Sequence, residues 1–385
     1  MKIYYKNWRL FLIFLFLFLS IAAILSRMIY VQVEQGKFLL QKGNNQNTSE
    51  RVIKFKRGSI YDKNGIPLAI SITGFDLFAL SGLSEDDFLK IKNTLKLKDS
   101  KYKPFNKKSL IKNSLSFEEM RKIRSLRIDR LELEKTYKRH YPLGEQVAPL
   151  VGFSGRDGYG LEGLEKSYNS ILTGKPLKER VLKDGVRSTI QRLEVLEFGE
   201  NSRDIYLTID SNIQYIAYKN LVEAIKNNDG TGGTVIILDN SAREVLALAS
   251  YPSYNPNNPM RSIKRNRAFL ESYEPGSIVK PLALAAAIEN DLIDIDTEME
   301  LPIKIEVDGN IINDREQYGQ LKAFEIIKES SQVGATQISF LLGAERLIDN
   351  YKKFGFSKPV NINFPSTSFG EINSRDEISD IEIAT

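Results

Sequence analysis

The chain opens with a long apolar run that stands apart from the sequence after it. Residues 10–25 carry no charge and are almost wholly apolar, and beyond Arg27 the run continues to Val31. Sixteen helical residues rise about 24 Å, and an arginine that extends its charge towards the headgroups lets such a helix reach roughly the hydrocarbon thickness. The pattern predicts a membrane-spanning helix over residues 10–31.

The residues around this run predict its orientation. Lys2, Lys6 and Arg9 precede it without an acidic residue, which places residues 1–9 in the cytoplasm and the bulk of the chain in the periplasm, anchored to an inner membrane by a single pass. A cleaved signal peptide is the alternative. The run ends in IAAILSRMIY, without a clear small-x-small cleavage site, so an uncleaved anchor is favoured.

Alternation of apolar and polar positions predicts strands after the anchor. In RVIKFKRGSIYDKNGIPLAISI, Val52 and Ile60 belong to an alternating stretch, residues 62–65 contain an Asn-Gly turn, and residues 68–70 are apolar. This pattern is typical of a β-hairpin.

Residues 84–125 are expected to form short helices. Their cluster of lysines from Lys101 to Lys112 is better explained as a solvated face than as a nucleic-acid site, because the segment is expected to lie outside the cytoplasm. We therefore expect no nucleic-acid partner.

Residues 126–230 mix strands, expected at 126–133 and 204–209, with helices. The glycines of DGYGLEGLEKSYN predict a turn before a helix, because no strand leads into them and no lysine ends the loop as in a phosphate-binding motif. A later helix begins at Asp210 or Ser211. The apolar face expected for it consists of Ile213, Ile216, Ala217, Leu221 and Ile225.

The composition changes near residue 231. GGTVIILDNSAREVLALAS predicts a hairpin that opens a new sheet, and a proline- and asparagine-rich loop follows it. The predicted class is therefore α/β (α+β). Its parts are a tail (1–9), an anchor (10–31), a mixed module (32–230) and a further domain (231–385).

Composition excludes several kinds of chemistry. The chain has no cysteine, and His140 is its only histidine. Disulfides, thiolate metal sites, cysteine nucleophiles and zinc sites built from several histidines are therefore excluded. The net charge of +5 is small for 385 residues and indicates no particular partner.

Ser277 and Lys280 are candidate catalytic residues at the start of an apolar helix. Two other Ser-x-x-Lys matches lie in the lysine-rich segment, so the pattern alone is weak. Glu274-Pro275-Gly276 predicts a turn, and Pro281 is tolerated only in a first helical turn. Residues three apart share a helix face, where a desolvated lysine can deprotonate a serine. On pattern alone, a plain helix cap with an exposed lysine remains equally open.

The order of several motifs resembles the class B penicillin-binding proteins. YEPGSIVKP is similar to the active-site motif of these serine acyl-transferases, and RGSIYDKNGIPLA to the signature of their membrane-anchored class. RHYPLGEQVAPLVGF, DGYGLEGLEKSYN and LTGKP resemble the class's amino-terminal module in order. The resemblance implies a non-catalytic pedestal, or dimerisation domain, at 32–230, followed by a penicillin-binding transpeptidase domain related to serine β-lactamases.

The resemblance also implies roles for individual residues. Ser277 corresponds to the acylated nucleophile and Lys280 to its general base. In ESSQVGA, Ser330 takes the position that relays a proton to the leaving group. Gln332 stands where the family has asparagine and is expected to bind the substrate backbone or the lysine, its amide lying one methylene further out. A plain helix cap is the alternative for Ser330 and Ser331.

A third family motif, Lys-Ser/Thr-Gly, does not occur in the sequence. In the family this motif lies downstream, on the strand that edges the active site. We therefore expect the sequence to be truncated at its carboxyl end, with an incomplete transpeptidase domain.

The function implied by the resemblance is cross-linking of cell-wall stem peptides that end in D-Ala-D-Ala, inhibited by β-lactams. EPGSIVKP and ESSQVGA are more similar to the septal enzyme of cell division than to the elongation enzyme. Implied partners are a membrane glycosyltransferase and other division proteins, and no cofactor or metal is needed. The alternatives are a non-catalytic scaffold, an elongation-type transpeptidase, and a carboxypeptidase or other hydrolase relative.

Overall fold

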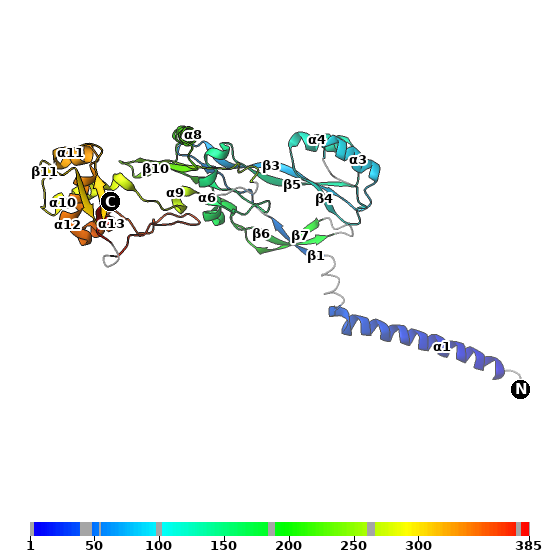
Figure 1. Cartoon of the computed structure of the whole chain (residues 1–385). Helices are drawn as coiled ribbons and strands as arrows, with labels where there is room; N and C mark the ends of the chain where they lie inside the picture. Colours follow the sequence, from blue (N-terminus) through cyan, green and yellow to red (C-terminus); the bar gives the residue numbers. More distant parts are fainter. Residues whose placement is uncertain are drawn as a thin grey trace. The chain divides into compact units, whose positions relative to one another are not determined.

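The structure, a computed structural model, divides the chain into two compact units. One unit contains residues 1–58 and 170–204, and the other contains residues 59–169 and 205–385. Figure 1 labels the helices and strands. The residues that the structure describes are 4–38, 48–53, 55–97, 102–183, 189–259, 266–374 and 379–384.

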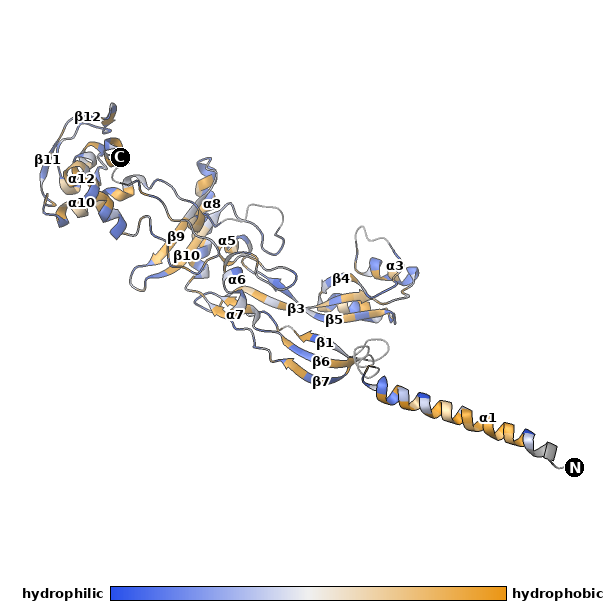
Figure 2. Ribbon diagram, turned by 90° about the horizontal axis from the view of Figure 1, so that it is seen from below, coloured by the Kyte–Doolittle hydropathy of each residue, from blue (hydrophilic) through white to orange (hydrophobic). Residues whose placement is uncertain are grey.

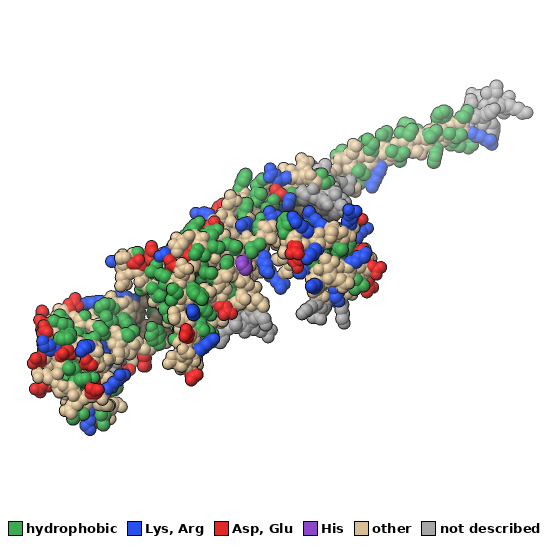
Figure 3. All heavy atoms as spheres, turned by 90° about the horizontal axis from the view of Figure 1, so that it is seen from above, with side chains coloured by type: hydrophobic (Ala, Val, Ile, Leu, Met, Phe, Trp, Pro, Cys, Tyr) green, Lys and Arg blue, Asp and Glu red, His purple; other side chains and the backbone are tan. Residues whose placement is uncertain are grey.

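The apolar run forms a long helix in the first unit. α1 spans Tyr4–Ile29, and a π-helical turn, η1 (Tyr30–Glu34), continues it. Residues Trp8–Glu34 are long and apolar enough to cross a membrane. Figures 2 and 3 show apolar residues along most of α1. The helix predicted over 10–31 is therefore present, and it begins earlier than expected.

The first unit also contains an antiparallel sheet in the order β1-β6-β7. These strands span Thr48–Ile53, Leu177–Lys183 and Thr189–Glu197. Val52 lies opposite Lys178, so its assignment to the predicted hairpin is wrong. The local alternation predicts a strand, and a strand is present, but its partner lies far along the chain. Ion pairs across the strands stabilise the pairing of β6 with β7. An example is the Lys178 Nζ, which lies 2.7 Å from the Glu197 Oε1.

The second unit begins with a sheet in the order β4-β3-β2-β8, and β5 also pairs with β3. The hairpin predicted around the Asn-Gly turn is confirmed by β2 and β3, with Gly65 at φ +81° in the turn. The strand expected at 126–133 begins later, and the one expected at 204–209 is shorter. The strands are β2 (Ile60–Tyr61), β3 (Pro67–Ala79), β4 (Ser109–Leu115), β5 (Leu131–His140) and β8 (Ile205–Tyr206).

Two helices pack beside this sheet. α3 (Glu85–Thr94) and α4 (Phe117–Ser125) are capped by the hydroxyls of Ser84 and Ser116, and Glu119 completes a capping box in α4. The short helices expected in residues 84–125 are present, but the strand β4, which was not expected, lies between them. Pairing with β3 decided its structure.

The glycine-rich segment packs tightly and forms no phosphate loop. A Cβ on Gly163 would lie 2.5 Å from the carbonyl oxygen of Leu150, and Gly163 has φ +57°. Only glycine fits this approach of two backbones. The prediction of a turn before a helix is confirmed by α6. The short helices here are η2 (Gly144–Gln146), α5 (Ala148–Val151) and α6 (Gly163–Ser167). The next helix, α7 (Asn169–Thr173), belongs to the first unit except for its first residue.

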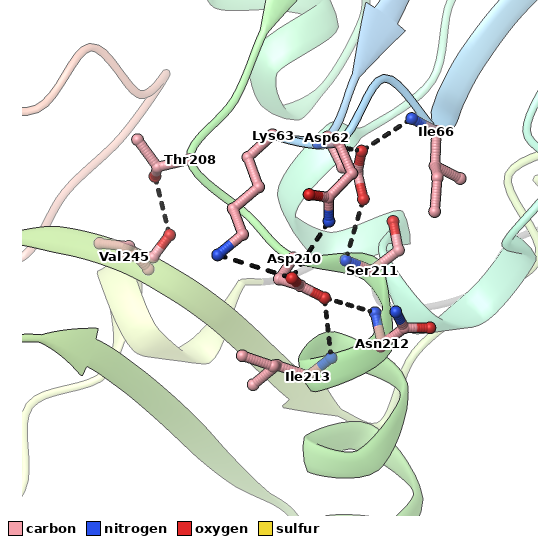
Figure 4. Close-up of polar contacts among 10 residues, drawn as sticks. Asp62, Lys63, Ile66, Thr208, Asp210, Ser211, Asn212, Ile213 and Val245 are labelled. Carbon is pink, nitrogen blue, oxygen red and sulfur yellow. Dashed lines mark hydrogen bonds and ion pairs between the residues drawn. The ribbon is translucent and has the colours of Figure 1, made fainter.

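The hairpin turn is held against the start of α8 (Ser211–Asn227) by two carboxylates (Figure 4). Asp62 is fully buried and accepts hydrogen bonds from the amides of Asn64, Ile66 and Ser211 at 2.7–3.1 Å. Asp210 caps α8 and accepts a hydrogen bond from the Asn64 side chain at 3.1 Å. The predicted helix start is confirmed. The negative charges of Asp62 and Asp210 lie near the positive end of the helix dipole, which is a stabilising arrangement.

α8 packs on the hairpin of β9 (Gly233–Asp239) and β10 (Glu244–Tyr251). Ala217, Leu221 and Ile225 form a core cluster with residues of β10, as predicted for this helix face. Ile216 is 56% exposed, so its assignment to that face is wrong. The predicted hairpin is confirmed by the antiparallel pairing of β9 and β10.

The last part of the second unit is built around α10 and α12, whose side chains share a core cluster. The Asn350 side chain donates to the carbonyl oxygen of Leu282 at 2.9 Å, and the path of α12 breaks at Gly343, with φ +74°. The elements are α9 (Arg267–Leu270), η3 (Gly276–Val279), α10 (Lys280–Glu289), β11 (Glu298–Leu301), β12 (Lys304–Val307), β13 (Asn310–Asn313), β14 (Gly319–Lys322), α11 (Ala323–Lys328), α12 (Gln332–Lys353) and α13 (Asp380–Ala384).

Candidate active site

The segment that carries Ser277 and Lys280 turns sharply before it becomes an α-helix. Gly276 has φ +63°, which favours glycine, and η3 then leads into α10 at Lys280. Pro281 lies in the first turn of α10, where its missing N–H costs no helical hydrogen bond. The predicted helix start is confirmed, although its first turn is a 3₁₀-helix.

Lys280 does not point freely into solvent. Its Nζ donates to the carbonyl oxygen of Ser330 at 2.9 Å and lies 3.4 Å from the Ser330 Oγ and from the carbonyl oxygen of Ser331. The alternative of an exposed lysine beside a simple helix cap therefore does not describe this side chain. Two segments that are far apart in the sequence meet at one amine.

Burial changes the acidity of this amine. Desolvation lowers the pKa of Lys280 below its ordinary value of 10.5, while the carboxylate of Asp314 acts in the opposite direction. Removing an ammonium from water disfavours its charged form, so a larger fraction is neutral at a given pH. A neutral amine can accept a proton from a hydroxyl.

Ser277 lies beside this amine in the sequence and is exposed. Its carbonyl oxygen accepts the backbone N–H of Lys280. Among the residues that the structure describes, no hydrogen bond joins the Ser277 hydroxyl to the Lys280 Nζ. Lys280 and Ser330 are brought together, and Ser277 stands at the same helix start with its hydroxyl accessible.

Ser330 has a strained backbone. α11 ends in a turn in which the amide of Ser330 donates to Ile327 and the amide of Ser331 to Ile326, the pattern of a Schellman motif. Ser330 occupies the position that usually carries glycine, with φ +54°. A side chain there costs of order 1 kcal/mol and is typical of functional sites. This conformation directs the Ser330 carbonyl and hydroxyl towards Lys280.

Ser331 caps α12 and contacts a residue that the sequence analysis missed. The Ser331 Oγ accepts from the amide of Gly334 at 2.9 Å and donates to Asp314 Oδ2 at 2.6 Å. Asp314 Oδ1 also accepts from the amides of Gln332 and Val333 at 2.5 and 3.2 Å. No signal in the sequence marks Asp314, because it lies in a loop before β14 and reaches α12 only through the fold.

Gln332 lies at the first turn of α12, and its side chain makes no polar contact with Lys280 among the residues that the structure describes. Its backbone amide binds Asp314, and its side chain is exposed. The polar contacts of Lys280 in the described part of the chain are with Ser330 and Ser331. Hydrogen bonding from the Gln332 side chain to Lys280 is therefore not present in this structure.

A shallow apolar groove of about 330 Å³ lies along α10 beyond Lys280. It contains no titratable side chain, so it adds no acid–base group to the site. Among the described residues, no group of three or more His, Asp or Glu side chains is arranged to hold a metal ion. The groove is lined by Pro281, Leu284, Ala285, Ile288, Ile295, Phe324 and Ile327.

Comparison with known proteins places two family domains on the chain. Residues 52–207 match the penicillin-binding protein dimerisation domain, and residues 233–385 match the penicillin-binding protein transpeptidase domain. The peptidoglycan D,D-transpeptidase FtsI of Buchnera aphidicola subsp. Schizaphis graminum is 31% identical over 100% of this chain and 70% of the relative. FtsI of Escherichia coli K12 is 28% identical over 98% of this chain and 67% of the relative.

Solved structures share the fold. A peptidoglycan synthetase from Bifidobacterium adolescentis superposes with a TM-score of 0.67 at 22% identity, over 88% of this chain and 68% of the other. A penicillin-binding protein, PBP2, in a complex with MreC from Helicobacter pylori superposes with a TM-score of 0.69 at 21% identity, over 88% of this chain and 72% of the other.

Proposed function

The chain belongs to the class B penicillin-binding proteins, and from this premise we propose that it is a peptidoglycan D,D-transpeptidase of the division septum. The observation that carries the proposal is the meeting of the Lys280 Nζ with Ser330 at the start of the helix that follows Ser277. A partly desolvated amine thus contacts Ser330 and lies on the residue three positions after Ser277. An acyl transfer needs a nucleophile, a base and a route for the proton, and three residues provide them.

In the proposed first step, the Ser277 Oγ attacks the carbonyl carbon between the two terminal D-alanines of a stem peptide. Neutral Lys280 accepts the hydroxyl proton as the new C–O bond forms. The proton then passes through the Ser330 hydroxyl to the departing nitrogen, the C–N bond breaks, and free D-alanine leaves. The Ser330 Oγ lies 3.4 Å from the lysine Nζ, which suits this relay.

In the second step, an amine of a neighbouring stem peptide attacks the acyl-enzyme. The new C–N bond forms, the ester C–O bond breaks, and the proton that the attacking amine loses passes to the departing Ser277 Oγ. Gln332 is proposed to contribute to substrate binding through its exposed side-chain amide, which can donate and accept. β-Lactams would acylate the same serine, because the carbonyl of their strained amide takes the place of the carbonyl between the two D-alanines.

The domain boundaries are likewise proposed. Residues 1–9 form a cytoplasmic tail, residues 10–31 the anchor, residues 32–230 the pedestal and residues 231–385 the transpeptidase domain. The matched ranges 52–207 and 233–385 and the apolar helix support this division. The anchor would hold the protein in an inner membrane by a single pass, with the bulk of the chain in the periplasm.

The proposed partners follow from this location and function. A membrane glycosyltransferase would supply the glycan strands that carry the stem peptides, and other division proteins would recruit the enzyme to the septum. The relatives that are named FtsI support the septal assignment over an elongation role.

Labelling with a fluorescent penicillin tests the proposal. The membrane-anchored protein in detergent is expected to become covalently labelled, and Ser277→Ala is expected to abolish the label. Ser272→Ala is a matched control, because this exposed serine lies just before the same turn and should leave labelling intact. Folded protein that takes no label would contradict the proposal and favour a non-catalytic scaffold.

Product analysis separates transfer from hydrolysis. With a D-Ala-D-Ala peptide and an amine acceptor, a transpeptidase yields free D-alanine and a cross-linked peptide in equal amounts. D-Alanine release without a cross-linked product would identify a carboxypeptidase instead.

A further inference from the structure

The carboxylate of Asp314 lies at the amino end of α12 and accepts three hydrogen bonds there. Oδ1 accepts the amides of Gln332 and Val333, and Oδ2 accepts the hydroxyl of Ser331. Ser331 is 1% exposed, so the contact with its hydroxyl is shielded from water. Hydrogen bonds to a charged acceptor in such a setting are stronger than neutral ones.

These bonds restrict the turn that faces the lysine. Ser330 has the left-handed conformation, which is unfavourable for serine unless its surroundings impose it. The Schellman hydrogen bonds to α11 hold one side of the turn. Asp314 holds the other side through the residue that follows Ser330. The turn is therefore fixed from both ends.

The fixed turn presents oxygen atoms to Lys280. The carbonyl oxygens of Ser330 and Ser331 lie 2.9 and 3.4 Å from the lysine Nζ. If the amino end of α12 moved, both carbonyls and the Ser330 hydroxyl would move with it. A displacement of about 1 Å at a reacting group can cost about a hundredfold in rate.

Asp314 also acts on the lysine through its charge. Its carboxylate favours the ammonium form and so raises the pKa of Lys280, against the larger effect of burial. Asp314 is the charged group that acts on this amine in the described part of the chain, and the nearby oxygens of Ser330 and Ser331 are neutral. Asp314 therefore favours catalysis by ordering the turn and opposes it by keeping Lys280 protonated.

We propose that Asp314 is a positioning residue for the acyl transfer, which holds Ser330 against Lys280 through the first turn of α12 without touching the substrate. This inference rests on the proposed function. Asp314 both orders the turn and places a negative charge near Lys280. Its removal should therefore reduce the acylation rate and also make Lys280 easier to deprotonate.

The test is β-lactam acylation measured across pH with Asp314→Asn. Asparagine keeps an acceptor for the two amides but loses the charge and the acceptor for the Ser331 hydroxyl. The rate constant at the optimum should fall at least about tenfold, and the acidic limb of the pH profile should move to lower pH. Asp314→Glu keeps the charge but misplaces it, so its rate should fall with the acidic limb unmoved.

Asp296→Asn is the matched control. Asp296 is an exposed carboxylate in the same part of the unit, paired with Lys322 at 3.2 Å, so its loss should change neither quantity. An Asp314→Asn protein with an unchanged rate and an unchanged profile would overturn the inference. A lower rate without any shift of the acidic limb would also overturn it, because a merely structural role predicts that result.

A second measurement separates this inference from the proposed function. The titration of the Lys280 ammonium can be followed by NMR after isotopic methylation, and Lys280→Arg assigns its signal. Asp314→Asn should lower the pKa of Lys280, and an unchanged titration would overturn the inference even if the parent protein is never acylated. Absence of acylation with the expected titration shift would instead contradict the proposed function alone.

Discussion

The Nζ of Lys280 lies 2.9 Å from the carbonyl oxygen of Ser330, a residue 50 positions later in the chain. The first belongs to the start of α10 and the second to the turn between α11 and α12. Their contact links the start of α10 to the turn that precedes α12, and the side chains of these two helices share a core cluster.

Ser330→Gly separates strain from function. Glycine removes the cost of the left-handed conformation, so the free energy of unfolding should rise by up to about 1 kcal/mol. Loss of the hydroxyl should nevertheless reduce acylation by penicillin, because the proposed relay is gone. Thermal unfolding and stopped-flow acylation measure the two effects. A large loss of stability would show that the serine side chain contributes more than its strain costs.

Lys280→Met tests the lowered pKa through stability. Between the lowered pKa in the folded protein and 10.5, the unfolded chain binds a proton that the folded protein does not. Stability of the parent therefore rises with pH across this window, and the methionine variant lacks this contribution. Urea unfolding at several pH values should show that the free energy of unfolding of the parent rises relative to that of Lys280→Met as the pH approaches 10.5. A difference independent of pH would contradict the prediction.

Asp62→Ala should destabilise the second unit by about 2 kcal/mol or more, because three amides lose a charged, buried acceptor. Chemical unfolding measures the change. Asp87→Ala is the control and should cost far less, because the Asp87 carboxylate is only partly buried and pairs with the exposed Lys90.

The Asp62 carboxylate should also make the free energy of unfolding depend on pH. Burial tends to raise the pKa of Asp62, but hydrogen bonds from Ser211, Ile66 and Asn64 together hold it below 3.8. Its contribution is therefore complete above pH 3.8 and is lost as pH falls through the lowered value. The parent should lose its advantage over Asp62→Ala in that range, and an advantage that persists below it would be inconsistent with this sign.

Gly334→Ala should destabilise the start of α12. An added Cβ would lie 2.7 Å from Ile326 Cγ2, which is fully buried, so the two helices would have to separate. Overpacking of this kind costs about 1–3 kcal/mol. Gly370→Ala is the control, since a Cβ there meets no atom within 4 Å. Equal melting temperatures for the two variants would refute the close approach.

Local patterns in the sequence determined several elements. The apolar run of α1, the Asn-Gly hairpin, the cap of α8 and the turn before α10 depend on interactions within a few residues, and each was predicted. Ser277 and Lys280 were singled out for the same reason. Proline and glycine restrict the backbone wherever they stand, and an apolar face indicates burial without reference to its partner.

Tertiary structure decided what depends on distant partners. Val52 joined β1 because β6 lies beside it, and residues 109–115 became a strand because β3 offered an edge. The exposure of the Gln332 side chain, the contact of Lys280 with Ser330, and the reach of Asp314 to α12 could not be read from spacing. Each depends on how loops far apart in the chain meet once the core between α10 and α12 has packed.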